Sequence, residues 1–256
     1  MTELLPELPE NWERCLVVAA HPDDIEYGTA GAVARWTAQG KRVTYLLATR
    51  GEAGIDGIHP DQAGPLREAE ERAGAREVGV DVVEFLDHRD GVVEGGLPLR
   101  RDIARAIRRH RPEIVVSGPY EIRMRSMGNF ANQADHRVVG LATLDAARDA
   151  GNRWIFPELL DEGLEPWDGV RYVCYAGGDT PTHGVDVTGE PLRRCIASLQ
   201  AHAEYNKGVQ MEAMIEQFLT WMAGLGGKAL GVESAVLFDT HVLRPEGPPP
   251  WVSAAE

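Results

Sequence analysis

A histidine and two carboxylates follow the first apolar segment of the chain, in the run His21-Pro22-Asp23-Asp24. Packing these groups into one tight turn is unfavourable unless a positive charge joins them, and a divalent metal ion is the simplest such partner. His21 and Asp24 are close enough in sequence to bind one ion, whereas Asp23 would point elsewhere and be free for acid–base chemistry. The alternative is that Asp24 caps a helix and His21 is a hydrogen-bonded turn residue. The residue types favour the metal site.

Two further histidines follow later apolar segments and are candidates to complete this site. His136 lies at the start of a predicted helix, where a cationic imidazole is unfavourable, so a neutral, metal-bound imidazole suits the position better. His88 has no comparable argument, and we interpret it as a loop residue. The sequence therefore favours His136 as the additional ligand.

Short apolar segments alternate with amphipathic ones over the first 150 residues, and this alternation must position the candidate ligands. It is typical of parallel βαβ units and indicates an α/β, Rossmann-like fold with a mostly parallel sheet flanked by helices on both faces. In such sheets, ligands bind at the carboxyl ends of the strands. The predicted strands span 15–20, 43–48, 82–86 and 114–117, and the predicted helices 28–39, 65–78, 99–110 and 135–150.

The second part of the chain, beyond Gly151, has weaker periodicity. Without an internal repeat or a long linker, we expect a single domain over 1–256, with a core of about 14–150 and a C-terminal extension of about 151–256. The tail from Arg244 is expected to be an ordered arm or a frayed end. Predicted strands span 171–176 and 184–187, and predicted helices 190–207 and 209–223.

The composition limits the partners of the protein. With 26 Lys and Arg against 40 Asp and Glu, the net charge is −14, so nucleic acid would be repelled and is not expected as a partner. Apolar runs reach only about six residues and the N-terminus is acidic, so neither a membrane span nor a secretory signal is expected. Cys15, Cys174 and Cys195 are scattered and odd in number, which favours buried free thiols in the cytoplasm. Self-association is left open.

Taken in order, the motifs resemble those of the LmbE-like/PIG-L family of N-acetylglucosamine deacetylases. The resemblance is clear over about residues 14–150 and continues loosely through VDVTGEPLRRCIASLQAHAEYN, which includes an Ala-His pair. The combination of H-P-D-D and D-H in the right order on βαβ units makes it specific. The matching segments are AAHPDDIEYGTAGAVARW, TRGEAG, LREAEERAGAREVGV, FLDHRDG, RPEIVVSG and ADHRVVG.

This resemblance implies one Zn²⁺ per chain, held by His21, Asp24 and His136, with one position open to water. It makes Asp23 the general base that takes the proton of the water and returns it to the leaving amine. The implied reaction removes the acetyl group of an N-acetylglucosamine-type substrate, a small acetamido sugar, and gives acetate and a free amine.

Three more positions are implied to contact the substrate. Arg67 and Asp90 match sugar-binding positions of the family, although Arg67 could instead pair with a glutamate on its own helix. Gln133 stands where the family's usual H-P-[DN]-H motif has its first histidine, and a glutamine has no proton to transfer. Either His183 or Arg123 takes over that role, or catalysis depends on the metal and Asp23 alone.

Other functions compete with the deacetylase interpretation. Within the family, the substrate could be the amide of a sugar–thiol conjugate, and the glutamine at 133 also suits a catalytically impaired binding homologue. Two histidines and a carboxylate are the ligand set of non-haem iron oxygenases as well. A dinucleotide-binding module lacks the required G-x-G-x-x-G, and the run GLGGKA at 224–229 does not fit a phosphate-binding loop.

Overall fold

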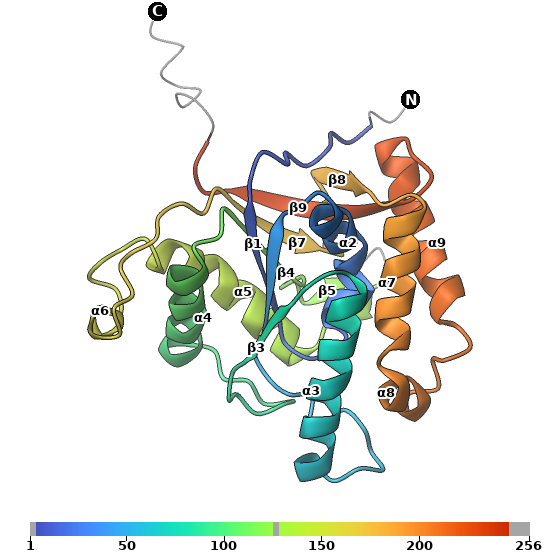
Figure 1. Cartoon of the computed structure of the whole chain (residues 1–256), viewed down its shortest axis with the longest axis horizontal. Coiled ribbons are helices and arrows are strands. Elements are labelled where there is room, and N and C mark those ends of the chain that lie inside the picture. Colours follow the sequence, from blue (N-terminus) through green and yellow to red (C-terminus); the bar gives the residue numbers. More distant parts are fainter. Residues whose placement is uncertain (1–3, 125–127, 246–256) are drawn as a thin grey trace, which may run out of the picture.

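The computed structural model describes residues 4–124 and 128–245, which are organised around a seven-stranded sheet (Figure 1). Its strand order is β3-β2-β1-β4-β7-β9-β8. The first five strands in this order are parallel, and β9 is antiparallel to both of its neighbours. The predicted α/β, Rossmann-like fold with a mostly parallel sheet is confirmed.

The central strand β1 shows why the sheet is covered on both faces. Along β1, Cys15, Val17 and Ala19 belong to one apolar cluster, and the alternate residues, with Ala20 just beyond the strand, belong to the other. This is the period-two alternation of a strand between two layers of helices. The strands of the sheet are β1 (Arg14–Ala19), β2 (Arg42–Leu47), β3 (Val82–Phe85), β4 (Ile114–Ser117), β7 (Tyr172–Ala176), β8 (His183–Asp186) and β9 (Ala235–Val242).

Helices cover the two faces unequally. Helices α4 and α5 pack against one face, and α2, α3, α7 and α9 lie on the other (Figure 1). A separate hairpin consists of β5 (Arg123–Met124) and β6 (Phe130–Ala131). The helices are α1 (Asp24–Gly28), α2 (Ala30–Ala38), α3 (Pro60–Glu77), α4 (Leu97–His110), α5 (Ala134–Asp149), α6 (Glu158–Asp161), α7 (Glu190–Gln200), α8 (Ala203–Gly208) and α9 (Ile215–Leu230).

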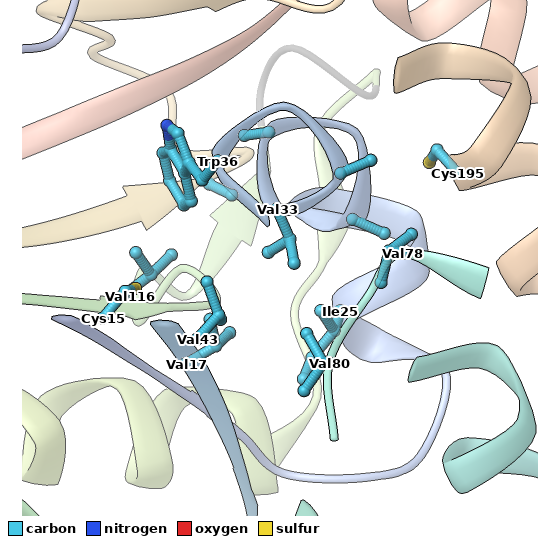
Figure 2. Packing of buried hydrophobic residues seen from close by; sticks show 14 of the residues in the cluster. Cys15, Val17, Ile25, Val33, Trp36, Val43, Val78, Val80, Val116 and Cys195 are labelled. Atoms are coloured by element: carbon cyan, nitrogen blue, oxygen red, sulfur yellow. The ribbon is translucent and has the colours of Figure 1, made fainter. Parts of the chain in front are cut away.

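The apolar face of α2 anchors the turn that follows β1. Figure 2 shows Val33 and Trp36 of α2 pointing toward the side chains of the sheet. Trp36 is completely buried, and its ring stacks on Phe238 of β9 with centroids 6.0 Å apart. Because α1 and α2 are almost continuous, this packing also holds the short α1 and the His21–Asp24 turn in front of it.

Several helix boundaries differ from the predictions. The helix expected at 28–39 begins earlier and breaks at Thr29, and the helix expected at 65–78 begins at Pro60, where His59 accepts a hydrogen bond from the Asp61 N–H at 3.3 Å. The helix expected at 190–207 is divided at His202 into α7 and α8. In each case a local capping or turn geometry decides where the helix begins or ends. The spacing of apolar residues, on which the prediction was based, does not.

The C-terminal part departs most from the sequence prediction. No strand was expected at 235–242, yet β9 lies in the sheet between β7 and β8. The helix expected at 209–223 is α9, at 215–230, and it contains the GLGGKA run. A Cβ at Gly226 would lie 2.2 Å from the Ala235 carbonyl oxygen, and one at Gly227 would lie 2.4 Å from the Glu233 carbonyl oxygen. These glycines allow α9 to pass close to the segment entering β9. This packing is a reason for the glycines of the GLGGKA run.

The other general expectations can be compared with the same structure. The three cysteines are buried and free, as predicted. Among helices within residues 4–124 and 128–245, none has the length and apolar character needed to cross a bilayer. Strands from both the predicted core and the predicted extension join one sheet, and the single domain stays a prediction. The tail beyond Pro245 lies outside the described residues.

Candidate metal centre

The three predicted ligands come together at the carboxyl ends of two adjacent parallel strands. His21 and Asp24 follow β1, and His136 lies in the first turn of α5, after β4. One ligand atom of each residue lies within 4.8 Å of the corresponding atoms of the other two. This is the arrangement expected when adjacent strands of a parallel sheet present their C-terminal loops to one site.

Asp24 is the centre of this cluster and does not cap a helix. Its Oδ2 accepts hydrogen bonds from the backbone N–H groups of Ala20 (3.2 Å) and His21 (2.9 Å), so the carboxylate folds back over the end of β1. Its Oδ1 lies 3.0 Å from His136 Nε2, and its Oδ2 lies 3.5 Å from His21 Nδ1. The capping alternative is therefore not what the structure shows.

Fixed partners orient the ring of His21. His21 Nε2 lies 3.0 Å from Asp90 Oδ1 and 3.3 Å from Asp135 Oδ2, and a carboxylate can only accept, so Nε2 carries the proton. Asp135 is itself held by backbone N–H groups of Gly91 and Val93, at 2.8 and 3.1 Å. The other ring nitrogen of His21, Nδ1, thereby faces Asp24.

The ring of His136 is oriented in the same way by a different partner. Its Nδ1 lies 3.0 Å from Asn132 Oδ1, an amide oxygen that only accepts, so Nδ1 is the protonated nitrogen. His136 Nε2 is buried and makes no well-aligned hydrogen bond, and it faces Asp24 Oδ1 at 3.0 Å. Two imidazole nitrogens and a carboxylate oxygen that face one another are a donor set that a divalent metal ion can use.

The charges of the cluster are strongly coupled. Burial disfavours the cationic form of His21, but Asp24, Asp135 and Asp90 outweigh it and raise the pKa of His21 to about 12. Burial likewise opposes ionisation of Asp24, but the two histidines hold the pKa of this carboxyl well below its ordinary value. The cluster attracts positive charge, and a divalent ion could supply it in place of the imidazole protons.

Asp23, the predicted base, occupies an unusual backbone conformation. Its φ is 87°, in the left-handed region that non-glycine residues rarely adopt. Its N–H donates to Glu71 Oε2 at 3.1 Å, and its Oδ1 accepts from Arg67 Nη2 at 3.0 Å. Burial and the charge of Asp24 raise the pKa of Asp23 to about 6, although Arg67 opposes the rise. A base with a pKa near neutrality suits proton transfer at physiological pH.

Two residues predicted to bind sugar instead support other site residues. The guanidinium of Arg67 is 1% exposed, contacts Asp23 and the Pro22 carbonyl, and lies 3.6 Å from the ring centroid of Tyr205. Asp90 pairs with His21 and accepts the Ala53 N–H at 2.8 Å. This geometry favours orienting roles for both and leaves direct sugar contact a prediction.

The TRGEAG motif has a packing role beside these residues. Gly51 has a φ of 63°, and a Cβ there would lie 3.1 Å from the Pro22 ring and 3.2 Å from Arg67 Nε. The glycine therefore lets the loop after β2 lie directly against the turn that carries Asp23.

Sequence reasoning missed a second cluster, formed by Glu26, Glu71 and His202, whose side chains are all 0% exposed. His202 Nε2 lies 3.7 Å from Glu26 Oε2 and 3.8 Å from Glu71 Oε2. Burial disfavours the cationic imidazole, but the two carboxylates outweigh it and raise the pKa of His202 to about 9. The sequence signals were the segment LREAEERAGAREVGV, which contains Glu71, and the Ala-His pair, which contains His202, and no role was assigned to either residue.

A cavity of about 440 Å³ opens onto the metal ligands. Asp24, His136 and Gln133 line it, and contact between Gln133 and a substrate stays a prediction. His183 begins the edge strand β8, and neither it nor Arg123 is among the described residues that line this cavity. His88 pairs with Asp102 at 3.3 Å, away from the site, as expected of a loop residue.

Comparison with known protein families identifies this arrangement. The family model of the GlcNAc-PI de-N-acetylases, PIG-L, matches residues 16–147, which contain all three candidate ligands. The chain belongs to this family. The deacetylase interpretation of the sequence is thereby confirmed at the level of the PIG-L family.

Curated relatives in the PIG-L family support the same chemistry. A 1D-myo-inositol 2-acetamido-2-deoxy-alpha-D-glucopyranoside deacetylase of Actinosynnema mirum is 41% identical, with 92% of this chain and 93% of the relative covered. A diacetylchitobiose deacetylase of Thermococcus kodakarensis is 30% identical, and the match covers 69% of this chain but only 64% of that enzyme. Both relatives are deacetylases of acetamido sugars.

A solved structure shows that the fold is shared as well. The N,N'-diacetylchitobiose deacetylase from Pyrococcus horikoshii, in complex with an inhibitor, superimposes with a TM-score of 0.82. The match covers 91% of this chain and 85% of that chain, at 21% identity. At that identity the likeness concerns the fold, and the roles of individual residues rest on the geometry described above.

Proposed function

We propose that this PIG-L protein is a zinc-dependent N-deacetylase that hydrolyses the acetamido group of a small amino-sugar derivative and releases acetate. One observation carries the proposal: the free nitrogens of His21 and His136 both face Asp24, and the opposite nitrogen of each ring is held by its own hydrogen-bond acceptor. Such second partners set the tautomer and the basicity of metal-ligating histidines.

His21, Asp24 and His136 would hold the ion, and a position would be left for water on the side of the 440 Å³ cavity, which Asp24 and His136 line. Zinc with three protein ligands lowers the pKa of a bound water toward ~7 and polarises a carbonyl oxygen. Other divalent ions could also bind these ligands. We propose zinc because the site offers two imidazoles and a single carboxylate.

Asp23 supplies the proton transfers. Its carboxylate takes a proton from the attacking water and delivers it to the nitrogen of the departing amine. Arg67 and Glu71 fix its orientation through its side chain and its backbone N–H, respectively. General-base catalysis depends on such positioning, because the carboxylate must lie within hydrogen-bond reach of the proton it abstracts.

Gln133 is the side chain that we propose to stabilise the oxyanion. It lies at the N-terminus of α5 and lines the same cavity as His136 and Asp24. Its amide can donate one hydrogen bond to the carbonyl oxygen as charge develops there, but it cannot donate a proton. Proton delivery is therefore left to Asp23.

The decisive experiment measures acetate release from a panel of N-acetylglucosamine derivatives by the protein reconstituted with one equivalent of Zn²⁺. We expect release that disappears with a chelator and returns with zinc. Oxygen uptake by the anaerobically iron-loaded protein, without acetate release, would support an oxygenase instead. Metal binding without turnover on any amide would support a binding homologue, and turnover of sugar–thiol amides alone would support an amidase.

We also propose a cytoplasmic location, since three buried free thiols suit a reducing compartment. Self-association remains a prediction, to be measured by the mass of the particle in solution.

A further inference from the structure

A second cavity adjoins the one above the metal ligands. It has a volume of about 330 Å³ and lies between α1, α2, α7, α9 and the end of the sheet at β8 and β9. The two cavities share Tyr27, Gly28, Gly177 and Met222 as lining residues. They are therefore neighbouring parts of one cleft, and the metal ligands line only one of them.

The second cavity is walled mainly by apolar side chains. Of the described residues that line it, Glu26 and Asp179 are the charged ones, and the Glu26 side chain is 0% exposed within the buried cluster. Sites of this size bind small molecules through apolar walls, with a few polar groups that fix orientation. The other side chains that line it include Leu192, Leu219, Met222, Ala223, Val236 and Leu237.

The cavity at the metal ligands has a mixed lining. Asp24, Gln133 and His136, together with Thr29 and Ser117, contribute polar groups, whereas Ile25, Phe218 and Met222 contribute apolar surface. A chain of sugar units would expose many hydroxyl groups, and each hydroxyl buried without a partner costs binding free energy.

The residues expected to meet such hydroxyl groups contact other site residues instead. Arg67 donates through Nη2 to Asp23, and Asp90 is held against His21. Neither is among the described residues lining the two cavities. The cleft beyond the acetamido group is thus poorly equipped for a second sugar and well equipped for hydrocarbon.

We infer that the substrate is an amphiphilic acetamido sugar whose apolar substituent occupies the 330 Å³ cavity beside α9. The inference rests on the proposed deacetylase function for the placement of the acetamido group at the metal. The sugar ring lies in the cavity at the metal ligands, and an alkyl or aryl group extends past Met222 toward Leu219 and Ala223.

The test measures binding by calorimetry, with the zinc-loaded Asp23→Asn protein so that no ligand is consumed. The ligands are N-acetylglucosamine β-glycosides with methyl, butyl, hexyl and octyl groups, and N,N'-diacetylchitobiose. We expect the affinity to rise about fourfold for each added methylene until the cavity is filled, because each buried methylene contributes about 0.8 kcal/mol.

Matched variants on α9 and before it locate the effect. Met222→Gln and Ala223→Phe should each lower the octyl-to-methyl affinity ratio by at least about tenfold, the first by adding a polar group and the second by filling space. Met214→Gln is the control, because Met214 is 53% exposed and does not line either cavity. Its ratio should equal that of the parent protein.

Two results would overturn the inference: an affinity that does not change with chain length, or tighter binding of diacetylchitobiose than of the octyl glycoside. An equal fall of the ratio in Met214→Gln would do the same. Failure of the deacetylase function gives a different result, because the zinc-loaded protein with Asp23 intact would then release no acetate from any glycoside. The binding series would still show whether the apolar cavity binds the alkyl group.

Discussion

His21, Asp24 and His136 form one cluster of histidine and carboxylate side chains, and Glu26, Glu71 and His202 form another, with Asp23 in contact with the second and adjacent in sequence to the first. Both clusters satisfy the distance criterion for a metal site. They differ in access, because Asp24 and His136 of the first line the 440 Å³ cavity, whereas all side chains of the second are 0% exposed and, of these, Glu26 lines the neighbouring 330 Å³ cavity.

The hydrogen bonds of the two clusters differ as well. In the first, an acceptor behind each ring leaves one imidazole nitrogen directed toward Asp24. In the second, both nitrogens of His202 lack a hydrogen-bond partner, and Glu71 is used to hold the backbone N–H of Asp23. Residue type and proximity therefore do not distinguish the two clusters. Our proposal that the first is the metal site depends on its cavity and on the oriented ring nitrogens.

The largest expected effect would separate the two clusters directly. His136→Ala should lose the bound ion and essentially all turnover, since it removes one of three ligands. His202→Gln should keep about one ion per chain. Elemental analysis of both proteins, with circular dichroism to verify folding, measures this. Undiminished metal in His136→Ala, or lost metal in folded His202→Gln, would break the comparison.

Asp23→Asn should reduce turnover by about 10²–10⁴-fold while the metal content stays near that of the parent protein, because asparagine keeps the shape but cannot accept the proton. Acetate release and metal content are measured on the same preparation. Loss of the ion together with activity would make Asp23 a ligand and exchange the roles of the two aspartates.

Gln133→Ala tests the contribution of Gln133 to the lining of the cavity. It should remove one hydrogen bond to a developing charge and raise the activation free energy by at most on the order of 2–4 kcal/mol. His183→Ala serves as the control, because His183 does not line the cavity. The measurement is kcat/KM for acetate release. A comparable loss in His183→Ala would show that His183 has taken over the role of the missing family histidine.

Glu71→Ala tests the role of the buried cluster and should lower kcat about tenfold with little change in KM, because the strained Asp23 loses the acceptor of its N–H. Glu71→Gln keeps an oxygen for that N–H and should lose less. The control is Glu70→Gln on the same helix, whose Oε1 accepts the Glu204 N–H at 2.6 Å. If Glu71 only stabilised the fold, the variants would differ in melting temperature, and kcat would not be lower in Glu71→Ala than in Glu71→Gln and Glu70→Gln.

The smallest effect is expected on the pH profile. Asp23 acts as a base only when ionised, and its pKa is raised to about 6, so kcat/KM should fall as the pH drops through about 6. Gln133 does not titrate and should add no ionisation, whereas Gln133→His should add one. A full bell-shaped profile in the parent protein would mean that another group supplies the acid.

The sequence by itself determined the sheet of parallel strands and the approach of the three candidate ligands. Alternating apolar segments specify βαβ units, and strands joined in this way end on the same edge, so His21, Asp24 and His136 had to approach one another. The prediction extended to the boundaries of β1 and β4 within one residue or so, since buried strands are continuous apolar runs.

Only the tertiary structure decided the antiparallel β9, the passage of α9 past it, and the cluster beneath Asp23. Gly226 and Gly227 weaken a helix by propensity, and only their contact with the segment entering β9 explains why the helix persists there. Likewise, Arg67 and Asp90 carry charges that suit a sugar as well as a neighbouring side chain. Which partner each of them contacts depends on packing between segments that lie far apart in the chain. A local pattern of residue types does not predict that packing.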